Sequence, residues 1–375
     1  MKVMMTGGGT GGHINPAIAI ADTIREHHPD AEITFVGTSM GLENRLVPRA
    51  GYSLEHIEIQ GLRRSLSLSN IKTAYLTLTS VSKAKKLLKK YAPDLVVGTG
   101  GYVCYPLCRA AAKLGIPSAV HESNAVPGLA VRMLSPYVDV IFTNFDEAAE
   151  HIKPKYRHKI IKVGNPGKRS GTAVTREEAR EKLGLANKYR YSVLIYGGSL
   201  GADTINHAAA DYAKKYLPSH PEIRLSHAAG VANYEEVKQL YGDAASASNL
   251  ELLDYIYDMP VRQAAADVVI CRSGAMTTSE LAEAGRAAIF VPSPNVTDDQ
   301  QYKNAKALAD RNAAVLIKDA DFNADTMNEA VNGILSDNAY RETLCRNITT
   351  FAVPDANERI YAELMKIAEE KNERR

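Results

Sequence analysis

Two patterns that would narrow the function at once are missing: a metal-binding cysteine set and a strong excess of one charge. The 375 residues include only four cysteines, scattered along the chain: Cys104, Cys108, Cys271 and Cys345. No cysteine and histidine set with metal-ligand spacing accompanies them, so we expect buried free thiols and no bound metal. The formal net charge of +2 gives no strong field for nucleic acid, so we expect no nucleic-acid partner.

A long apolar run and an N-terminal leader are missing as well. No run approaches the roughly 18 apolar residues that a membrane-spanning helix needs. Residue 2 already belongs to a predicted strand, so we expect no secretory signal peptide before it. Together with the unpaired cysteines, this predicts a protein of the reducing cytoplasm.

Short apolar segments alternate with helical stretches along the whole chain. Predicted strands lie at residues 2–6, 32–37, 54–59, 94–100, 117–122, 139–144, 159–166, 191–198, 222–230, 251–256, 267–274, 287–292 and 313–318. Runs of Val and Ile without polar alternation are typical of parallel strands buried on both faces. Strand and helix alternation of this kind predicts an α/β fold.

The chain is expected to divide near the turn-forming segment 165–171. Just beyond it, Thr175 and Glu178 have the spacing of a capping box and predict a helix start. An apolar strand followed by a glycine loop and a helix occurs twice, at residues 2–12 and 192–202. This weak repeat predicts two Rossmann-like domains, residues 1–164 and 165–352, followed by a last helix in residues 353–375.

The glycine-rich loop after the first strand, residues 6–12, contains a formal G-x-G-x-x-G pattern. Its glycines and the following helix N-terminus favour a phosphate or another oxyanion, without showing which ligand binds. A dinucleotide site also needs an acidic residue at the end of the second strand. That strand ends at Thr38 without one, and Glu43 lies well beyond it in sequence. The lysine of a Walker loop is missing too, so we expect neither a dinucleotide nor a Walker-type nucleotide here.

His13 follows this loop directly. We expect it in the first turn of a helix that begins near Asn15, with Pro16 close to the first position. The positive end of a helix disfavours an imidazolium ion, so the ring should stay neutral. A neutral imidazole at a glycine loop could act as a general base, or it could only hydrogen-bond the loop. The residues alone leave both interpretations open.

Two more loops of the first half follow predicted strands. One contains Gly98, Gly100 and Gly101 with the hydroxyl of Tyr102, and the other spans residues 121–128. Because α/β sites gather at the carboxyl ends of strands, these loops and the glycine-rich loop predict one shared site.

The second half offers a separate set of candidates. The loop 197–201 and the helix that starts near Ala275 can both receive phosphates on backbone N–H groups. Glu280, about one turn into that helix, could accept both hydroxyls of a ribose or could be an ordinary exposed residue. Amides in the segment 298–301 suit sugar hydroxyls. A formal D-x-D pattern at 319–321 is interpreted as a turn.

Seven segments in this order carry a resemblance: GGGTGGHINPA, GTGGYVCYP, HESNAVPG, GNP, GGSLGA, RSGAMTTSE and DDQQYKNA. Together they resemble the MurG family over nearly the whole chain. The combination is highly specific, although each segment alone is not. Members transfer N-acetylglucosamine (GlcNAc) from UDP-GlcNAc to undecaprenyl-pyrophosphoryl-N-acetylmuramyl (MurNAc)-pentapeptide, called lipid I, and so make lipid II for peptidoglycan.

The resemblance implies the GT-B fold, two Rossmann-like domains facing each other across a cleft, with the last helix returning to the first domain. It places UDP-GlcNAc on Ser199, Ile256, Ala275, Met276, Thr277, Glu280, Gln300 and Gln301, with Thr10, Gly11, Gly12 and Asn124 closing on the sugar. It places the acceptor diphosphate on Gly9, Gly100, Gly101 and Tyr102. His13 is the first candidate for the base and Glu122 the second, without cofactor or metal.

One position departs from the family pattern. Members often carry an arginine soon after the GNP turn, where this chain has Lys168 and Arg169. Either residue could contact the UDP-GlcNAc uracil or the hinge, but only arginine has a fixed fork of donors.

A lipid-linked acceptor further implies peripheral contact with the inner face of the cell membrane. The basic and apolar segment 63–90, with Lys83, Lys86 and Lys90, is the candidate, or it is a solvated helix. Two other functions stay open: another UDP-GlcNAc enzyme on this fold, such as a 2-epimerase or another lipid glycosyltransferase, and a nucleotide-sugar-binding protein without turnover.

Overall fold

A computed structural model describes residues 1–59, 69–167, 174–198 and 201–372. The chain forms two compact units: unit 1 comprises Met1–Lys168 with Val353–Arg375, and unit 2 comprises Arg169–Ala352. The predicted boundary after residue 164 lies a few residues before the one between the units. The last predicted segment begins at residue 353, where the chain re-enters unit 1.

Unit 1 is built on a parallel seven-stranded sheet of order β3-β2-β1-β4-β5-β6-β7. The strands are β1 (Lys2–Thr6), β2 (Glu32–Gly37), β3 (Ser53–His56), β4 (Leu95–Gly98), β5 (Ser118–Glu122), β6 (Val140–Thr143) and β7 (Ile160–Lys162). The helices are α1 (Gly11–His27), α2 (Glu43–Arg49), α3 (Ser69–Tyr91), α4 (Cys104–Leu114), α5 (Leu129–Leu134) and α14 (Ala356–Asn372), with short 3-10 turns at Asp146–His151 and Pro154–Lys159.

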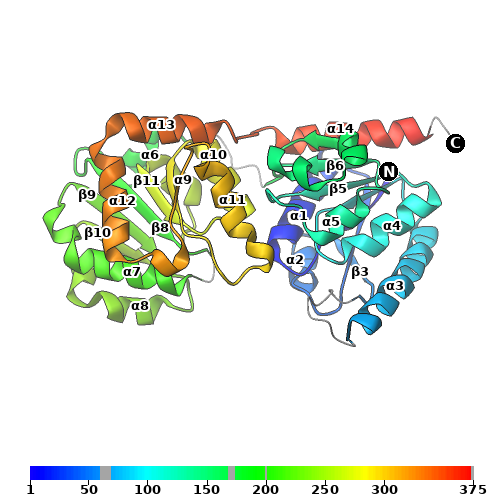
Figure 1. Ribbon diagram of the computed structural model, residues 1–375, viewed down its shortest axis with the longest axis horizontal. Coiled ribbons are helices and arrows are strands. Elements are labelled where there is room, and N and C mark those ends of the chain that lie inside the picture. Colours follow the sequence, from blue (N-terminus) through cyan, green and yellow to red (C-terminus); the bar gives the residue numbers. More distant parts are fainter. Residues whose placement is uncertain (60–68, 168–173, 199–200, 373–375) are drawn as a thin grey trace. The chain divides into compact units, whose positions relative to one another are not determined.

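Alternating side chains of β1 explain why helices cover both faces of this sheet. Met5 points into a core shared with Ile20 of α1 and Leu364 of α14. Met4 points into the opposite core, shared with Leu88 of α3 and Leu107 of α4. Figure 1 shows the resulting three-layer arrangement of helices, sheet and helices.

The last helix, α14, packs against α1 in unit 1 (Figure 1). Tyr361 stacks on His27 with ring centroids 4.1 Å apart, and its hydroxyl lies 2.9 Å from Nε2 of His28. Near the end of the helix, Lys371 donates to Asp139 at 2.8 Å. These contacts and the apolar face of α14 anchor the end of the chain on unit 1.

Unit 2 holds a parallel six-stranded sheet of order β10-β9-β8-β11-β12-β13. The strands are β8 (Tyr191–Tyr196), β9 (Ile223–Ala228), β10 (Leu250–Leu253), β11 (Val268–Cys271), β12 (Ala287–Phe290) and β13 (Val315–Leu316). The helices are α6 (Arg176–Lys182), α7 (Asp203–Lys215), α8 (Tyr234–Tyr241), α9 (Met259–Ala265), α10 (Ala275–Ala284), α11 (Gln300–Ala309), α12 (Ala324–Ser336) and α13 (Asn338–Thr349).

The structure confirms the predicted α/β fold with two parallel sheets, and each predicted strand overlaps an observed one. The capping box of Thr175 and Glu178 is also confirmed. The predicted start of the first helix is wrong: α1 begins at Gly11, so Pro16 lies inside it. Proline is tolerated there at the cost of one helical hydrogen bond, because only the partner of the Gly12 carbonyl is lost.

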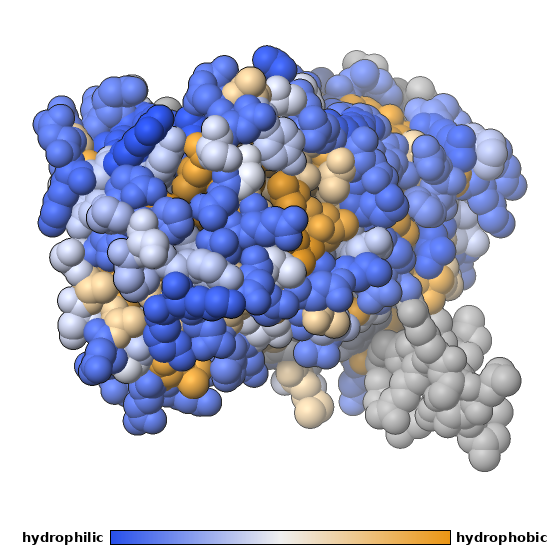
Figure 2. Space-filling model, turned by 60° about the vertical axis from the view of Figure 1, so that its left-hand side comes forward, coloured by the Kyte–Doolittle hydropathy of each residue, from blue (hydrophilic) through white to orange (hydrophobic). Residues whose placement is uncertain are grey.

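None of the helices in the described ranges is long and apolar enough to cross a membrane. Figure 2 shows that hydrophilic residues cover most of the face in view, with hydrophobic residues in separate patches. The four cysteines are free, as the sequence predicts, and Cys104, Cys108 and Cys271 are buried, whereas Cys345 is only partly buried.

A buried histidine connects three elements of unit 2. His227 of β9 lies with Nδ1 2.8 Å from the Tyr241 hydroxyl and Nε2 3.1 Å from Oδ1 of Asn206. Because an amide oxygen only accepts, Nε2 donates to Asn206 and Nδ1 accepts from the tyrosine. Burial lowers the pKa of His227 to about 3, so the ring stays neutral in the folded protein.

Acid should therefore destabilise the protein in part through His227. The folded pKa of about 3 lies below the ordinary value of 6.5, so the unfolded chain binds more protons between these values. The free energy of unfolding should fall as the pH drops below about 6.5, by up to about 1.4 kcal/mol per pH unit. His227 should add no pH dependence above that range.

Urea unfolding of the His227→Gln variant measures this contribution. The variant should be less stable than the parent near neutral pH but should lose less stability on acidification. Equal losses in both proteins would contradict the assignment.

Candidate active site

The site residues predicted in unit 1 lie at the carboxyl ends of three neighbouring strands. β1 leads into the glycine-rich loop, β4 into the loop of residues 99–103, and β5 into the loop of residues 123–128. Because β1, β4 and β5 are adjacent in a parallel sheet, the three loops share one edge.

The glycines of the first two loops are needed because the loops touch through backbone atoms. A Cβ on Gly7 would lie 2.2 Å from Oγ1 of Thr99, and one on Gly101 would lie 2.5 Å from the Gly8 carbonyl oxygen. Gly101 also has a φ of +78°, which favours glycine. The glycine pattern thus serves loop packing, whatever ligand the loops meet.

His13 is the third residue of α1 and is held by the loop after β4. Its Nδ1 lies 3.1 Å from the Thr99 carbonyl oxygen, while the Thr99 hydroxyl donates to the His13 carbonyl at 2.6 Å. A carbonyl only accepts, so Nδ1 carries the proton and Nε2 keeps its lone pair. Gly100 lies against the ring, where a Cβ would come within 2.5 Å of Nδ1.

The two interpretations of His13 are therefore compatible. Nδ1 hydrogen-bonds the loop, and Nε2 is available to act as a general base. Burial lowers the pKa of His13, although the nearby Glu122 charge and the bond to Thr99 raise it. A neutral ring with a free lone pair on Nε2 can accept a proton at neutral pH.

Glu122, the second candidate base, is used to shape the loop after β5. One carboxylate oxygen accepts from the backbone and side-chain N–H of Asn124 at 3.0 and 2.9 Å. The other accepts from the Gly128 N–H at 2.8 Å. Since both oxygens are engaged and the residue is buried, the geometry favours His13 as the base.

The remaining candidates of unit 1 surround the start of α1. Thr10 is the exposed N-cap residue of α1, followed by Gly11 and Gly12 in its first turn. Tyr102 lies in the loop after β4 and is 39% exposed, so its hydroxyl can reach a ligand. The Gly9 N–H already donates to a carboxylate oxygen of Glu43 at 3.1 Å, so only other atoms of Gly9 can meet a phosphate.

The position of Glu43 corrects one sequence argument. Although it lies five residues beyond Thr38, its carboxylate folds back to the end of β2 and accepts from the Thr38 N–H and hydroxyl at 2.9 and 2.8 Å. An acidic group is therefore present at that strand end. It is already used by the protein, so it is poorly suited to bind a dinucleotide ribose.

In unit 2, Arg272 holds the turn between β11 and α10. It donates to the carbonyl of Val291 at 3.0 Å and forms an ion pair with Asp319. Asp319 also accepts from Thr204 at 3.0 Å and lies in a 3-10 turn, Asp319–Asp321. This confirms that the D-x-D pattern is a turn.

The predicted phosphate site lies at the start of α10, directly after this turn in the chain. The helix starts at Ala275, as expected, with Gly274 at its N-cap. Ala275, Met276 and Thr277 form its first turn and are partly buried. Their N–H groups lie at the positive end of the helix.

The loop before α11 places the two predicted glutamines. The amide oxygen of Gln301 accepts from the Ser293 N–H at 2.9 Å, and its backbone carbonyl accepts from the Ser273 hydroxyl at 2.8 Å. The Gln301 amide is thus oriented with its NH₂ group as the donor end for a sugar hydroxyl. Gln300 is the first residue of α11 and lies beside it.

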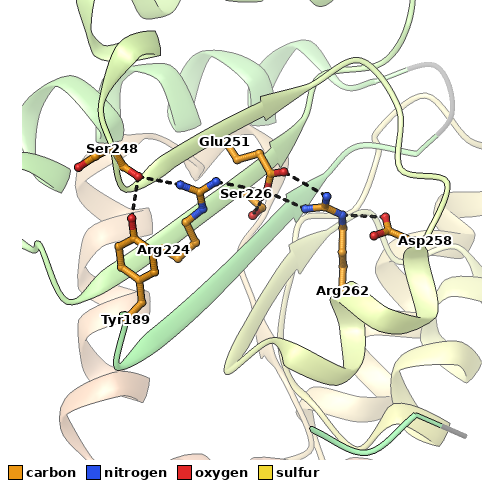
Figure 3. Close-up of polar contacts among 7 residues, drawn as sticks. All are labelled: Tyr189, Arg224, Ser226, Ser248, Glu251, Asp258 and Arg262. Carbon is orange, nitrogen blue, oxygen red and sulfur yellow. Dashed lines mark hydrogen bonds and ion pairs between the residues drawn. The ribbon is translucent and has the colours of Figure 1, made fainter. Parts of the chain in front are cut away.

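Ion pairs hold the loop that carries Ile256 (Figure 3). Arg262 of α9 donates to both carboxylate oxygens of Glu251 on β10, at 2.7 and 3.1 Å. It also donates to Asp258, at the other end of the loop, at 2.8 Å. Arg262 therefore joins the residues before and after Ile256, whose side chain is buried.

Glu280 lies on α10 with its side chain reaching solvent. Partial loss of solvation, and then the negative charge of Glu283, raise the pKa of Glu280 to about 7. Its protonation state therefore changes in the physiological pH range.

Three predicted residues, Lys168, Arg169 and Ser199, lie outside the described residues. Sequence reasoning missed four residues that hold the loops: Glu43, Thr99, Arg262 and Asp319, the last read only as part of a turn. Local spacing could have suggested only the pair of Arg262 with Asp258, four residues apart on one helix turn, because the other decisive contacts join residues distant in sequence.

Comparisons with known proteins cover both units. The model of the glycosyltransferase family 28 N-terminal domain matches residues 3–143, and that of the family 28 C-terminal domain matches residues 192–360. The chain is also similar to the UDP-N-acetylglucosamine--N-acetylmuramyl-(pentapeptide) pyrophosphoryl-undecaprenol N-acetylglucosamine transferase of Acetivibrio thermocellus, with 40% identity over 99% of each chain. The transferase of that name from Bacillus licheniformis is 38% identical over 98% of this chain and 99% of its own.

Among solved structures, the chain is similar to MurG of Acinetobacter baumannii, with a TM-score of 0.79 and 29% identity over 97% of this chain and 99% of that one. A UDP-GlcNAc 2-epimerase of Neisseria meningitidis has a TM-score of 0.64 and 15% identity over 98% of this chain and all of the other. At that identity the likeness shows the fold alone, and both neighbours agree with the predicted GT-B fold. Because the chain is about 40% identical to curated relatives over nearly the full length of both, it belongs to the MurG family of glycosyltransferases.

Proposed function

We propose that this protein transfers GlcNAc from UDP-GlcNAc to the C4 hydroxyl of the MurNAc residue of lipid I, with inversion at the anomeric carbon, and so makes lipid II for peptidoglycan. The near full-length identity to transferases of this name supports the choice of substrates. The observation that carries the chemistry is His13, whose Nδ1 lies 3.1 Å from the Thr99 carbonyl oxygen, which leaves Nε2 as the acceptor nitrogen.

The reaction needs one base and one stabilised leaving group. Nε2 of His13 removes the proton of the C4 hydroxyl as that oxygen bonds to C1 of GlcNAc, and the bond from C1 to the diphosphate oxygen of UDP breaks. A single displacement inverts C1 and needs no second carboxylate. The N-terminus of α10 stabilises the negative charge that develops on the UDP diphosphate.

Acceptor-dependent UDP release tests the function and the base together. With a soluble lipid I analogue, the protein should release UDP and form a disaccharide product, while His13→Ala should be slower by about 10²- to 10⁴-fold. UDP-GlcNAc affinity should largely persist in the variant, because His13 is not among the residues proposed to bind the nucleotide sugar and most of those lie in unit 2. His27→Ala, on the same helix α1 but at its other end, is the matched control and should keep the parent rate.

Other outcomes identify the competing functions. UDP release or epimerisation without acceptor would point to a 2-epimerase-like enzyme. Tight binding of UDP-GlcNAc with no chemistry would point to a binding protein. Unchanged turnover in His13→Ala would exclude His13 as the base while leaving the transferase activity intact.

Binding of UDP-GlcNAc should weaken as the pH falls below about 7. We propose that the ionised Glu280 accepts hydrogen bonds from both ribose hydroxyls, and a protonated carboxyl loses one such acceptor. Since the pKa of Glu280 is about 7, calorimetric titrations above and below that pH should show the change. Glu280→Gln should abolish this dependence, and Glu283→Gln should move it to lower pH; a pH-independent affinity in the parent would refute the role.

We also propose that α3 contacts the anionic inner surface of the membrane. Ala84 and Leu88 are buried in the core of unit 1, and Lys83 and Lys90 pair with Glu58 and Glu55. The exposed Lys85, Lys86 and Lys89 on the same helix supply cations for lipid headgroups.

Reversal of these charges tests the contact. The triple change Lys85→Glu, Lys86→Glu and Lys89→Glu should reduce co-sedimentation with vesicles containing anionic lipid. Reversal of exposed lysines of unit 2, Lys182→Glu and Lys238→Glu, is the control. Unchanged co-sedimentation of the α3 variant would exclude this surface.

A further inference from the structure

A buried carboxylate, that of Glu43, contacts the glycine-rich loop directly. Its side chain is 1% exposed, and it lies in the first turn of α2. One carboxylate oxygen accepts from the Thr38 N–H and hydroxyl, at 2.9 and 2.8 Å, and the other from the Gly9 N–H, at 3.1 Å. The carboxylate therefore connects the end of β2 to the loop after β1.

Glycines clear the space that this side chain occupies. A Cβ on Gly37 would lie 2.6 Å from Cγ of Glu43, and one on Gly41 would lie 1.9 Å from a carboxylate oxygen. On the other side, a Cβ on Gly8 would lie 3.0 Å from the carboxylate. Three glycines thus give the side chain a close-fitting path to the loop, which leaves little freedom for another arrangement.

The loop that Glu43 holds is itself packed against the elements that hold His13. The Gly8 carbonyl faces Gly101, where a Cβ would come within 2.5 Å. A Cβ on Gly100, in the same loop, would lie 2.5 Å from Nδ1 of His13, and one on Gly7 would lie 2.7 Å from the His13 carbonyl oxygen. A shift of Gly8 and Gly9 therefore cannot occur without moving the groups around the imidazole.

The charge of Glu43 suits this role. Burial alone would raise its pKa, but hydrogen bonds from Thr38 and Gly9 more than offset this and lower the pKa. Glu43 thus stays ionised at neutral pH and acts only as an acceptor.

We propose that Glu43 is a positioning residue, which holds the glycine-rich loop at the location where the acceptor diphosphate and His13 meet. The role rests on the proposed transferase function. Because Glu43 takes the Gly9 N–H, it also settles which backbone groups of the loop face the acceptor. Glu43 touches neither substrate and acts through Gly9.

Glu43→Gln separates the hydrogen bond to Gly9 from the volume of the side chain. Glutamine has nearly the same shape, but one end of its amide donates instead of accepting. The amide oxygen can accept from both donors of Thr38, its N–H and its hydroxyl, so it is favoured on that side and the NH₂ group faces the Gly9 N–H. The variant therefore keeps the packing and loses one end of the bridge.

In steady-state assays, Glu43→Gln should lower kcat/KM for the lipid I analogue by about tenfold or more. The KM for UDP-GlcNAc should change less than kcat/KM for the acceptor, because most of the residues proposed to bind the nucleotide sugar lie in unit 2. Glu55→Gln is the matched control: Glu55 is paired with Lys90 and Tyr91 in the same unit, far in sequence from the loop, and its loss should not change acceptor kinetics. Thr38→Val, which removes one donor but leaves the Gly9 bond, should have a smaller effect than Glu43→Gln.

Hydrogen exchange of the Gly9 amide gives a readout that does not depend on activity. In protein labelled with ¹⁵N-glycine, the Gly9 amide should be protected in the parent and should exchange faster in Glu43→Gln, but not in Glu55→Gln. Faster exchange in a protein without transferase activity would support the anchor while refuting the proposed function.

Two results would overturn the proposal. One is parent-like acceptor kinetics in Glu43→Gln, which would show that the loop holds its position without the bridge. The other is an equal loss in Glu43→Gln and Glu55→Gln that follows their thermal stabilities, which would reduce Glu43 to a general stabilising role.

Discussion

The loops after β1 and β4 touch through backbone atoms, and the position of His13 depends on that contact. Any side chain on Gly7, Gly100 or Gly101 would collide with Thr99, His13 or Gly8. The loops can therefore lie this close only because these positions are glycine. Their packing places the Thr99 carbonyl oxygen 3.1 Å from Nδ1 of the histidine ring. The tautomer of His13, and hence its capacity to accept a proton on Nε2, follows from this packing.

Carboxylates at this edge of unit 1 hold backbone N–H groups, which leaves His13 as the proposed base. Glu43 and Glu122 each accept hydrogen bonds from backbone N–H groups of the loops that they hold. Both lie near the start of short helices, where a negative charge is favoured. A neutral base and fixed carboxylates suit an acceptor that carries a diphosphate, since a freely placed anion would repel it.

Unit 2 holds its loops with ion pairs. Arg272 and Asp319 fix the turn before α10, and Arg262 joins Glu251 to Asp258 around the loop of Ile256. The arginine fork can donate in several directions at once, so one side chain holds two segments of backbone. The elements proposed to bind a nucleotide sugar are thus positioned before any ligand arrives, which lowers the ordering cost of binding.

The sequence by itself determined the elements: apolar runs predicted the strands, the glycine loops marked the strand ends, and ordered motifs predicted the family. These are local signals, because strand and turn preferences act between neighbours in the chain. The tertiary structure alone decided which groups meet. The bond from Gly9 to Glu43 spans 34 residues and that from His13 to Thr99 spans 86. It also decided that α1 starts at Gly11 and that Glu122 supports a loop, since hydrogen-bond partners depend on how the sheet brings distant strand ends together.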